Sequence, residues 1–253
     1  MCSPIVSDGH IARGSSVLRV LIVCIGGLLC LAGAHAAERI SYRSGGLTLA
    51  GYLCLPVGPG PFAAVVYNHG GVGDRVGGAP RETCEVLATA GYVGFSPIRR
   101  ATRSLDGHGD DIRAALARLQ QVAGVDASRR IAMIGFSRGA LLTYQAAIET
   151  PSLKAAVLMA TAVPPRQFAR SMGEPADIAM PLLFLVTEND TGSRTTKGRN
   201  TLKGTRDMHR TLADAGKDAT LIVYPPYGDD GHTLFFSVGA YMSDVLVFLS
   251  RHF

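Results

Sequence analysis

The sequence lacks the patterns by which proteins commonly hold metals, nucleotides or nucleic acids. Its 253 residues include 7 histidines and 5 cysteines, but no H-x-x-x-H and no C-x-x-C spacing that would gather ligands around a metal ion. No glycine-rich phosphate loop follows the first expected parallel strand. The net charge of +5 is mild and does not indicate a nucleic-acid-binding face. We therefore expect no cofactor, no metal and no nucleic-acid partner.

Internal repeats and low-complexity tracts are also missing, and aromatic residues are few, at 7% of the chain. What the sequence does have is apolar content of 47% spread over a length that suits one α/β domain. A chain of this size can bury a large single core. We expect one globular domain, preceded by a short segment of different character.

That segment is residues 1–36. Two arginines precede an uncharged run over residues 20–31, and Ala34-His35-Ala36 then offers small residues at alternate positions, as signal peptidase prefers. This predicts a secretory signal peptide cleaved after Ala36, leaving a mature domain over residues 37–253 in the periplasm or outside the cell. The apolar run is too short to span a bilayer comfortably, so we expect no membrane anchor after cleavage, with a retained anchor as the alternative.

Two cysteines, Cys54 and Cys84, would remain in the mature chain. They could form a disulfide in an oxidising compartment. However, Cys54 lies in an apolar strand pattern and Cys84 in a helical one, where a buried free thiol fits equally well. Both alternatives stay open.

The mature chain has one local concentration of positive charge, over residues 194–206. Arg194, Lys197, Arg199, Lys203 and Arg206 fall within it. Such a run is typical of a solvated loop; attraction of an anionic substrate is the alternative interpretation.

Strand and helix patterns alternate along the mature chain after an initial hairpin turned at Gly45-Gly46. Apolar strands that alternate with helices predict a mostly parallel sheet covered by helices on both faces. The connection over residues 162–180 is long enough for a short flap but not for a lid domain. We expect strands over residues 39–49, 47–56, 62–67, 92–97, 131–136, 155–160, 181–187 and 219–224, and helices over residues 80–90, 110–122, 140–148, 200–215 and 233–253.

The segment Gly135-Phe136-Ser137-Arg138-Gly139 joins one of these strands to a helix. A G-x-S-x-G sequence in that setting is typical of a nucleophile elbow, in which a strained turn exposes the serine at the edge of the sheet. Side chains at either glycine would collide with the neighbouring strand or helix. Ser137 is therefore the candidate nucleophile.

A serine nucleophile needs a base that takes its proton and an acid that orients the base. In chains with this kind of elbow, the acid follows the serine in the sequence and the histidine follows the acid. Asp190 comes directly after the strand over residues 181–187, and we predict it as the acid, with Glu188 as a weaker rival. His232 lies in the loop before the last helix and is predicted as the general base. Asp229 and Asp230 more naturally turn or cap that loop.

The segment Asn68-His69-Gly70-Gly71 follows the first parallel strand, at the loop that supplies a backbone donor to the oxyanion in this arrangement. We predict an oxyanion hole formed by the N–H of Gly70 or Gly71 and the N–H of Arg138. His69 is interpreted as a structural residue of the loop.

With these motifs together, the chain resembles an α/β-hydrolase of the dienelactone hydrolase group over residues 39–253. The resemblance implies an eight-stranded sheet and a Ser/Cys-His-Asp triad that acts on esters or lactones of small carboxylic acids. Ser137 stands where the enzymes that open dienelactones have cysteine.

We therefore expect a serine hydrolase that cleaves esters or lactones of small substrates through Ser137, His232 and Asp190, with short acyl chains preferred. One alternative is a serine peptidase of the prolyl oligopeptidase kind, although such enzymes usually carry an extra domain. The other is a non-catalytic binding protein on the same fold.

Overall fold

The computed structural model describes residues 36–126, 128, 130–164, 168–173 and 175–253. The predicted signal peptide lies outside the described residues except for its last position. Within the described ranges, no helix combines the length and apolar character needed to cross a membrane.

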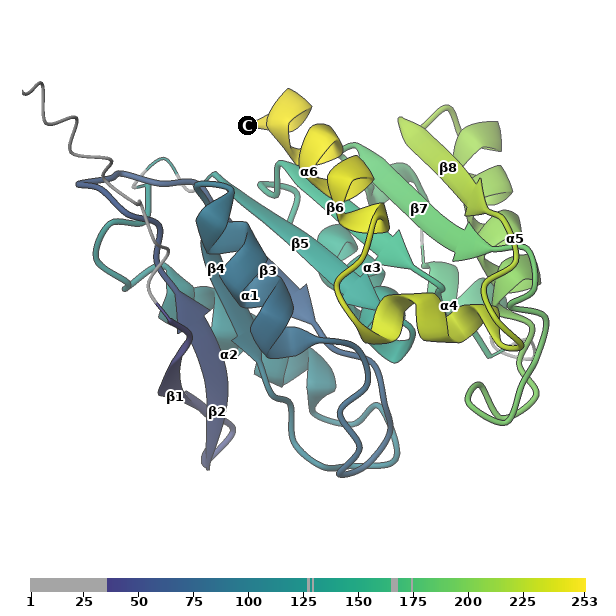
Figure 1. The fold of residues 1–253 in the computed structure, drawn as a ribbon, viewed down its shortest axis with the longest axis horizontal. Coiled ribbons are helices and arrows are strands. Elements are labelled where there is room, and N and C mark those ends of the chain that lie inside the picture. Colours follow the sequence, from purple (N-terminus) through teal and green to yellow (C-terminus); the bar gives the residue numbers. More distant parts are fainter. Residues whose placement is uncertain (1–35, 127, 129, 165–167, 174) are drawn as a thin grey trace, which may run out of the picture. The chain divides into compact units, whose positions relative to one another are not determined.

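An eight-stranded sheet forms the centre of the domain (Figure 1). Its strands are β1 Glu38–Ser44, β2 Leu47–Cys54, β3 Ala64–Asn68, β4 Val93–Pro97, β5 Ile131–Phe136, β6 Ala155–Met159, β7 Leu182–Thr187 and β8 Ala219–Tyr224. They lie in the order β1-β2-β4-β3-β5-β6-β7-β8. The pairs β1–β2 and β2–β4 are antiparallel, and every pair from β4 to β8 is parallel. The predicted mostly parallel sheet is confirmed.

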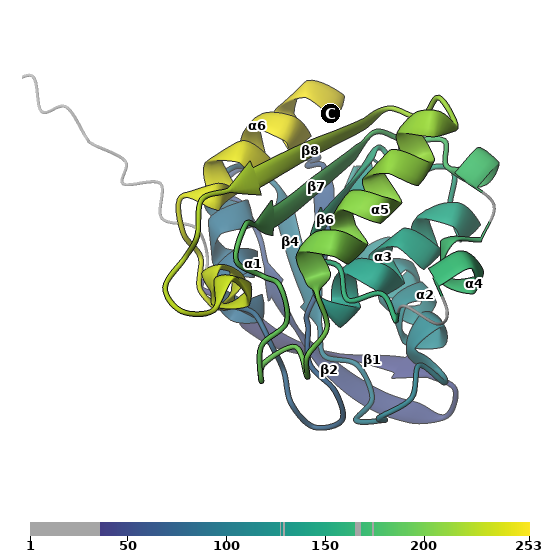
Figure 2. The same ribbon diagram turned by 90° about the vertical axis from the view of Figure 1, so that its right-hand side faces the viewer.

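Helices cover both faces of this sheet (Figure 2). The helices α1 Pro80–Thr89 and α6 Tyr241–His252 pack on one face. The helices α2 His108–Leu119, α3 Arg138–Glu149 and α5 Thr201–Asp214 pack on the other. The sheet is thus the middle of three layers, as the alternating pattern predicted.

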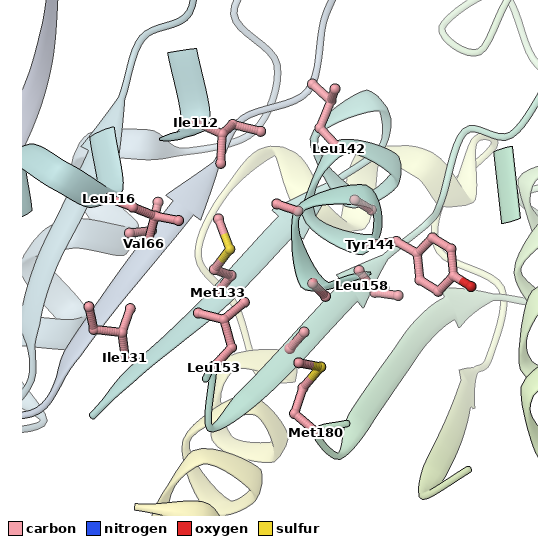
Figure 3. Close-up of a cluster of buried hydrophobic side chains, with 14 of the residues drawn as sticks. Val66, Ile112, Leu116, Ile131, Met133, Leu142, Tyr144, Leu153, Leu158 and Met180 are labelled. Atoms are coloured by element: carbon pink, nitrogen blue, oxygen red, sulfur yellow. The ribbon is translucent and has the colours of Figure 1, made fainter. Parts of the chain in front are cut away.

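Burial on both faces explains why the central strands are continuously apolar. Val66 and Met133 point into the core cluster shared with α2 and α3 (Figure 3). Their neighbours Val65 and Ile134 point into the opposite cluster, which α6 completes. Each such side chain contributes about 1.5–3 kcal/mol by leaving water, which favours apolar residues along both strands. The polar exception is Asn68 at the end of β3, whose buried amide donates to the Thr143 hydroxyl at 2.8 Å.

The predicted single helix over residues 233–253 is wrong in its first half. A 3-10 helix, η3 (Gly231–Phe236), comes first; Ser237 then has extended backbone, and α6 begins only at Tyr241. The interruption lets Phe235 and Tyr241 pack together in one core cluster, with ring centroids 5.0 Å apart. This tertiary contact favours the break over the continuous helix that the local pattern suggested.

The connection over residues 162–180 carries only short elements where it is described: the helix α4 (Phe168–Met172) and the 3-10 turn η2 (Pro175–Asp177). Tyr144 of α3 donates a hydrogen bond to the Met172 carbonyl at 2.7 Å. The described part of this connection therefore packs on α3, and it is too short to form a lid domain.

A disulfide joins Cys54 and Cys84, the pairing that the sequence left open. Cys54 ends β2 and Cys84 lies in α1, and both are fully buried. The bond links the antiparallel edge of the sheet to the helix that follows the loop after β3. The sequence left this pairing undecided, because 30 residues separate the two positions.

We predict that the Cys54→Ala/Cys84→Ala variant loses roughly 2–4 kcal/mol of unfolding free energy, because the open chain gains entropy in the unfolded state. Urea unfolding of the oxidised wild type, the reduced wild type and the variant measures this loss. Equal stability of the oxidised and reduced wild type would contradict the prediction.

Candidate active site

The turn between β5 and α3 forces Ser137 into a conformation that residues other than glycine rarely adopt. Ser137 has φ 55° and ψ −117°, which costs about 1–3 kcal/mol. A Cβ at Gly135 would lie 2.4 Å from the Gly139 carbonyl oxygen, and a Cβ at Gly139 would lie 2.0 Å from the Asn68 carbonyl oxygen. The predicted elbow and both of its glycines are therefore confirmed by the geometry of the turn.

Three side chains predicted from separate loops meet at this turn. The Ser137 Oγ lies 3.1 Å from the His232 Nε2, and the His232 Nδ1 lies 2.7 Å from the Asp190 Oδ2. Because an ionised carboxylate only accepts hydrogen bonds, Nδ1 carries the proton and Nε2 is left to accept from the serine hydroxyl. The side chains of His232 and Asp190 are almost completely buried.

Asp190 is held in place by the start of α5. The Leu202 N–H donates to the Asp190 carbonyl at 2.9 Å, and the Thr201 hydroxyl donates to the same oxygen at 3.3 Å. Glu188, the weaker rival in the sequence, has an exposed position instead. The structure brings Asp190, and not Glu188, to the histidine.

The loop that carries His232 is fixed by two residues. Asp230 caps η3 by accepting from the His232 N–H at 3.1 Å, as its predicted role required. Asn189 was not predicted: its amide donates to the Gly228 carbonyl at 3.0 Å, and its oxygen accepts from the Tyr227 N–H at 3.0 Å. Asn189 therefore links the loop that carries Asp190 to the loop that carries His232. No local sequence pattern predicts such a contact.

The loop after β3 approaches Ser137 closely. A Cβ at Gly70 would lie 3.2 Å from the Ser137 Cβ, and Gly71 has φ 91°, a value that favours glycine. The Gly70 N–H donates to the Gly77 carbonyl at 2.8 Å, so Gly70 is withdrawn from the predicted oxyanion donors. Among the hydrogen bonds of the described residues, neither the Gly71 N–H nor the Arg138 N–H donates to a protein acceptor. These two N–H groups therefore remain as the candidate oxyanion donors.

His69 fixes the direction of the Gly71 N–H. Its Nε2 accepts from the Arg99 N–H at 3.2 Å, so its Nδ1 carries the proton and donates to the Gly70 carbonyl at 2.6 Å. In a trans peptide the C=O and the next N–H point in opposite directions, so anchoring the Gly70 oxygen aims the Gly71 N–H. Burial, and then the charge of Arg99, lower the pKa of His69 to about 3, which keeps the ring neutral.

A cavity of about 820 Å³ opens beside Ser137. Leu105, Leu141 and Phe236 contribute apolar walls, and the Phe136 ring packs 4.8 Å from the His232 ring. Within the described ranges, no three or more His, Cys, Asp or Glu side chains are grouped so that they could hold a metal ion. The site as described consists of the Ser137 hydroxyl, the His232 imidazole that Asp190 orients, and two backbone N–H groups without a protein acceptor among the described residues.

Known proteins resemble this chain in sequence and in fold. Among curated proteins, the uncharacterized peptidase YtmA of Bacillus subtilis is 33% identical over 117 residues. The match covers 44% of this chain and 45% of that protein, so it spans less than half the length of the relative.

Three solved structures illustrate the likeness in fold. Acylaminoacyl peptidase of Pyrococcus horikoshii superposes with a TM-score of 0.67 at 17% identity, over 85% of this chain and 41% of that chain. An esterase of Rhizomucor miehei superposes with a TM-score of 0.67 at 16% identity, over 85% of this chain and 83% of that chain. A Klebsiella pneumoniae protein described as a dienelactone hydrolase superposes with a TM-score of 0.61 at 22% identity, over 85% of this chain and 98% of that chain. Identities this low show the α/β-hydrolase fold alone.

The sequence itself matches the model of the dienelactone hydrolase family over residues 49–236. This range runs from β2 to the end of η3 and contains the loop after β3, the elbow and the loops of Asp190 and His232. Since the match spans most of the domain and every part of the site, the chain belongs to the dienelactone hydrolase family of hydrolases.

Proposed function

We propose that this protein is a serine hydrolase that cleaves carboxylic esters or lactones of small substrates through an acyl-enzyme. The observation that carries the proposal is the hydrogen-bonded row from Ser137 through His232 to Asp190. A serine becomes nucleophilic when a neutral imidazole can take its proton and a buried carboxylate orients that imidazole.

In the first half of the reaction, the Ser137 Oγ attacks the ester carbonyl carbon while the His232 Nε2 takes the hydroxyl proton. The N–H groups of Gly71 and Arg138 donate to the oxyanion that develops on the carbonyl oxygen. The tetrahedral intermediate then collapses, the C–O bond to the alcohol breaks, and His232 returns the proton to the departing alkoxide. Asp190 stabilises the imidazolium in between.

In the second half, water attacks the acyl-enzyme and His232 accepts the proton of that water. Collapse of the second intermediate breaks the bond to the Ser137 Oγ, which regains its proton from His232. The acid leaves, and the enzyme returns to its starting state. For a lactone the alcohol and the acid stay joined, and one open-chain hydroxy acid is released.

A peptidase activity is the second candidate. It is favoured by the likeness to YtmA and to acylaminoacyl peptidase, both of which are named as peptidases. The sequence match covers 45% of YtmA, and the superposition covers 41% of the acylaminoacyl peptidase chain. Matched pairs of an ester and an amide with the same acyl group decide between the candidates, because a peptidase hydrolyses the amide at a significant rate and an esterase does not.

We further propose that the mature protein works in the periplasm or outside the cell, without a stable membrane anchor. The buried Cys54–Cys84 disulfide supports this, since such bonds persist in oxidising compartments. Fractionation of cells that produce the full-length chain, with the N-terminus of the product sequenced, tests both the compartment and cleavage after Ala36.

We predict that Ser137→Ala lowers kcat for a short ester such as 4-nitrophenyl acetate by roughly 10⁴- to 10⁶-fold without changing the fold. Intact-mass analysis after exposure to a fluorophosphonate should show one adduct on the wild type and none on the variant. Ser250→Ala, an exposed serine of α6, is the matched control and should keep full activity. A tenth of the activity retained by Ser137→Ala would rule out the proposal.

We also predict that His69→Phe lowers kcat roughly tenfold or more while KM changes little, because the Gly71 N–H loses its alignment with the oxyanion. Since the pKa of His69 is about 3, the pH profile of the remaining activity between pH 5 and 9 should keep its shape. His252→Phe, near the C-terminus, serves as the control. Wild-type kcat in a folded His69→Phe protein would show that His69 has no positioning role.

A further inference from the structure

Five cationic side chains line the cavity beside Ser137, and the described lining residues include no aspartate or glutamate. Arg194, Lys197 and Arg199 come from the loop between β7 and α5, Arg75 from the loop after β3, and Arg138 from the start of α3. The positive charges therefore reach the cavity from three separate segments.

The structure divides the basic segment that the sequence singled out over residues 194–206. Its first three cations face the cavity, whereas Lys203 lies in α5 and pairs with Asp207. Arg206 also lies in α5 and is not among the lining residues. Arg194 and Lys197 are exposed, as the solvated-loop interpretation expects, and they also line the cavity, as the alternative interpretation requires.

No ion pair among the described residues balances the charge of the five cavity cations. Among the described residues, none of the five takes part in a salt bridge, whereas Arg81, Arg100, Arg113, Arg130 and Arg210 all do. The Arg138 guanidinium is held only by the Ser104 carbonyl, to which its Nη1 donates at 2.9 Å. An unpaired cluster of one sign raises the free energy of the folded protein until an anion binds there.

Repulsion among these groups extends from the cavity into the interior. Burial, and then the charge of Arg199, lower the pKa of Arg138. Burial, and then the charge of Arg138, lower the pKa of Arg99 to about 10. Arg99 is almost fully buried, and its Nε and Nη1 find no acceptor among the described residues. Positive charge thus backs the cavity as well as lining it.

No carboxylate of the described residues forms a salt bridge with a cavity cation. Asp190 is hydrogen-bonded to His232. Burial raises the pKa of Asp230, but hydrogen bonds from Thr195, Ser193 and the His232 N–H outweigh it and lower that pKa, so this carboxylate is already engaged. Asp74 precedes Arg75 on an exposed stretch.

We propose that the substrate of this enzyme is an anionic ester, with at least one carboxylate or phosphate group on the part that extends from Ser137 toward the loop over residues 194–199. This rests on the proposed ester hydrolysis and adds its substrate class. The cations bind the charged group, while the Gly71 and Arg138 N–H groups receive the reacting carbonyl oxygen. The bond that breaks is the ester bond already described, with water as the only co-reactant.

Three acetate esters of nearly equal shape test the proposal: 4-acetoxybenzoate, 4-acetoxyphenyl phosphate and the neutral 4-acetoxybenzamide. We expect kcat/KM for at least one anionic ester to exceed that for the amide by roughly tenfold or more. The larger of the two anionic values identifies carboxylate or phosphate as the preferred group. Raising the salt concentration from 20 to 500 mM should reduce this preference, because screening weakens the attraction.

The Arg194→Gln/Lys197→Gln/Arg199→Gln variant should lose most of the ratio between the anionic and neutral esters. Lys154→Gln is the matched control, since Lys154 is exposed just before β6, at the opposite end of the strands from the site, and should leave the ratio unchanged. If the triple variant does not fold, the salt titration of the wild type still decides.

The outcomes separate this inference from the proposed function. If none of the three esters is hydrolysed, or if Ser137→Ala hydrolyses them equally well, the proposed function fails. If Ser137 hydrolyses all three but the neutral ester is as good as the anionic ones, only the anionic substrate class is overturned. The anionic substrate class is also overturned if the preference for anionic over neutral esters persists both at 500 mM salt and in the triple variant.

Discussion

The parallel pairing of the central strands is the constraint on which the whole site depends. In a parallel sheet all strands run the same way, so their carboxyl ends meet at one edge. Here β3 and β5 are in register with Asn68 beside Gly135, so the loop after β3 starts next to the elbow. The loops after β7 and β8 emerge from the same edge with Asp190 and His232. Residues 42 and 95 positions apart thereby come within hydrogen-bonding distance.

Close backbone contact around the elbow sets the accuracy of that arrangement. α3 packs so tightly against the end of β3 that Gly139 touches the Asn68 carbonyl. The strained Ser137 is held by its own N–H, which donates to the Met159 carbonyl of β6 at 2.8 Å. The surrounding layers over-determine this conformation, which is how a sparsely populated backbone geometry persists. Rigidity here matters because a donor misplaced by about 1 Å loses much of its effect on a transition state.

Electrostatics divide the domain into two regimes. Behind the site, Arg100 pairs with Asp111, whose side chain is fully buried and also accepts from the Arg100 N–H. The neighbouring Arg99 is buried, and its Nε and Nη1 find no acceptor among the described residues. At the cavity, the five lining cations have no such partners within the described ranges. A buried or clustered charge is tolerated where pairing or solvent compensates it, and the anionic group of the proposed substrate would add such compensation at the cavity.

Much of this protein was determined by the sequence alone, because the signals are local. Apolar runs and helical periodicity predicted every strand and most helices, and the G-x-S-x-G turn with its later Asp190 and His232 predicted the residues that meet. Tertiary structure decided the rest. Core packing of Phe235 against Tyr241 interrupts the last helix. The hydrogen bond from the Gly70 N–H to Gly77 removes Gly70 from the oxyanion donors, and proximity in the folded chain allows Cys54 and Cys84 to form a disulfide. The hydrogen bonds of Asn189 to the loop before His232, and the position of residues 194–199 at the cavity, also depend on which distant loops lie side by side. Periodicity along a chain carries no information about the contacts between such loops.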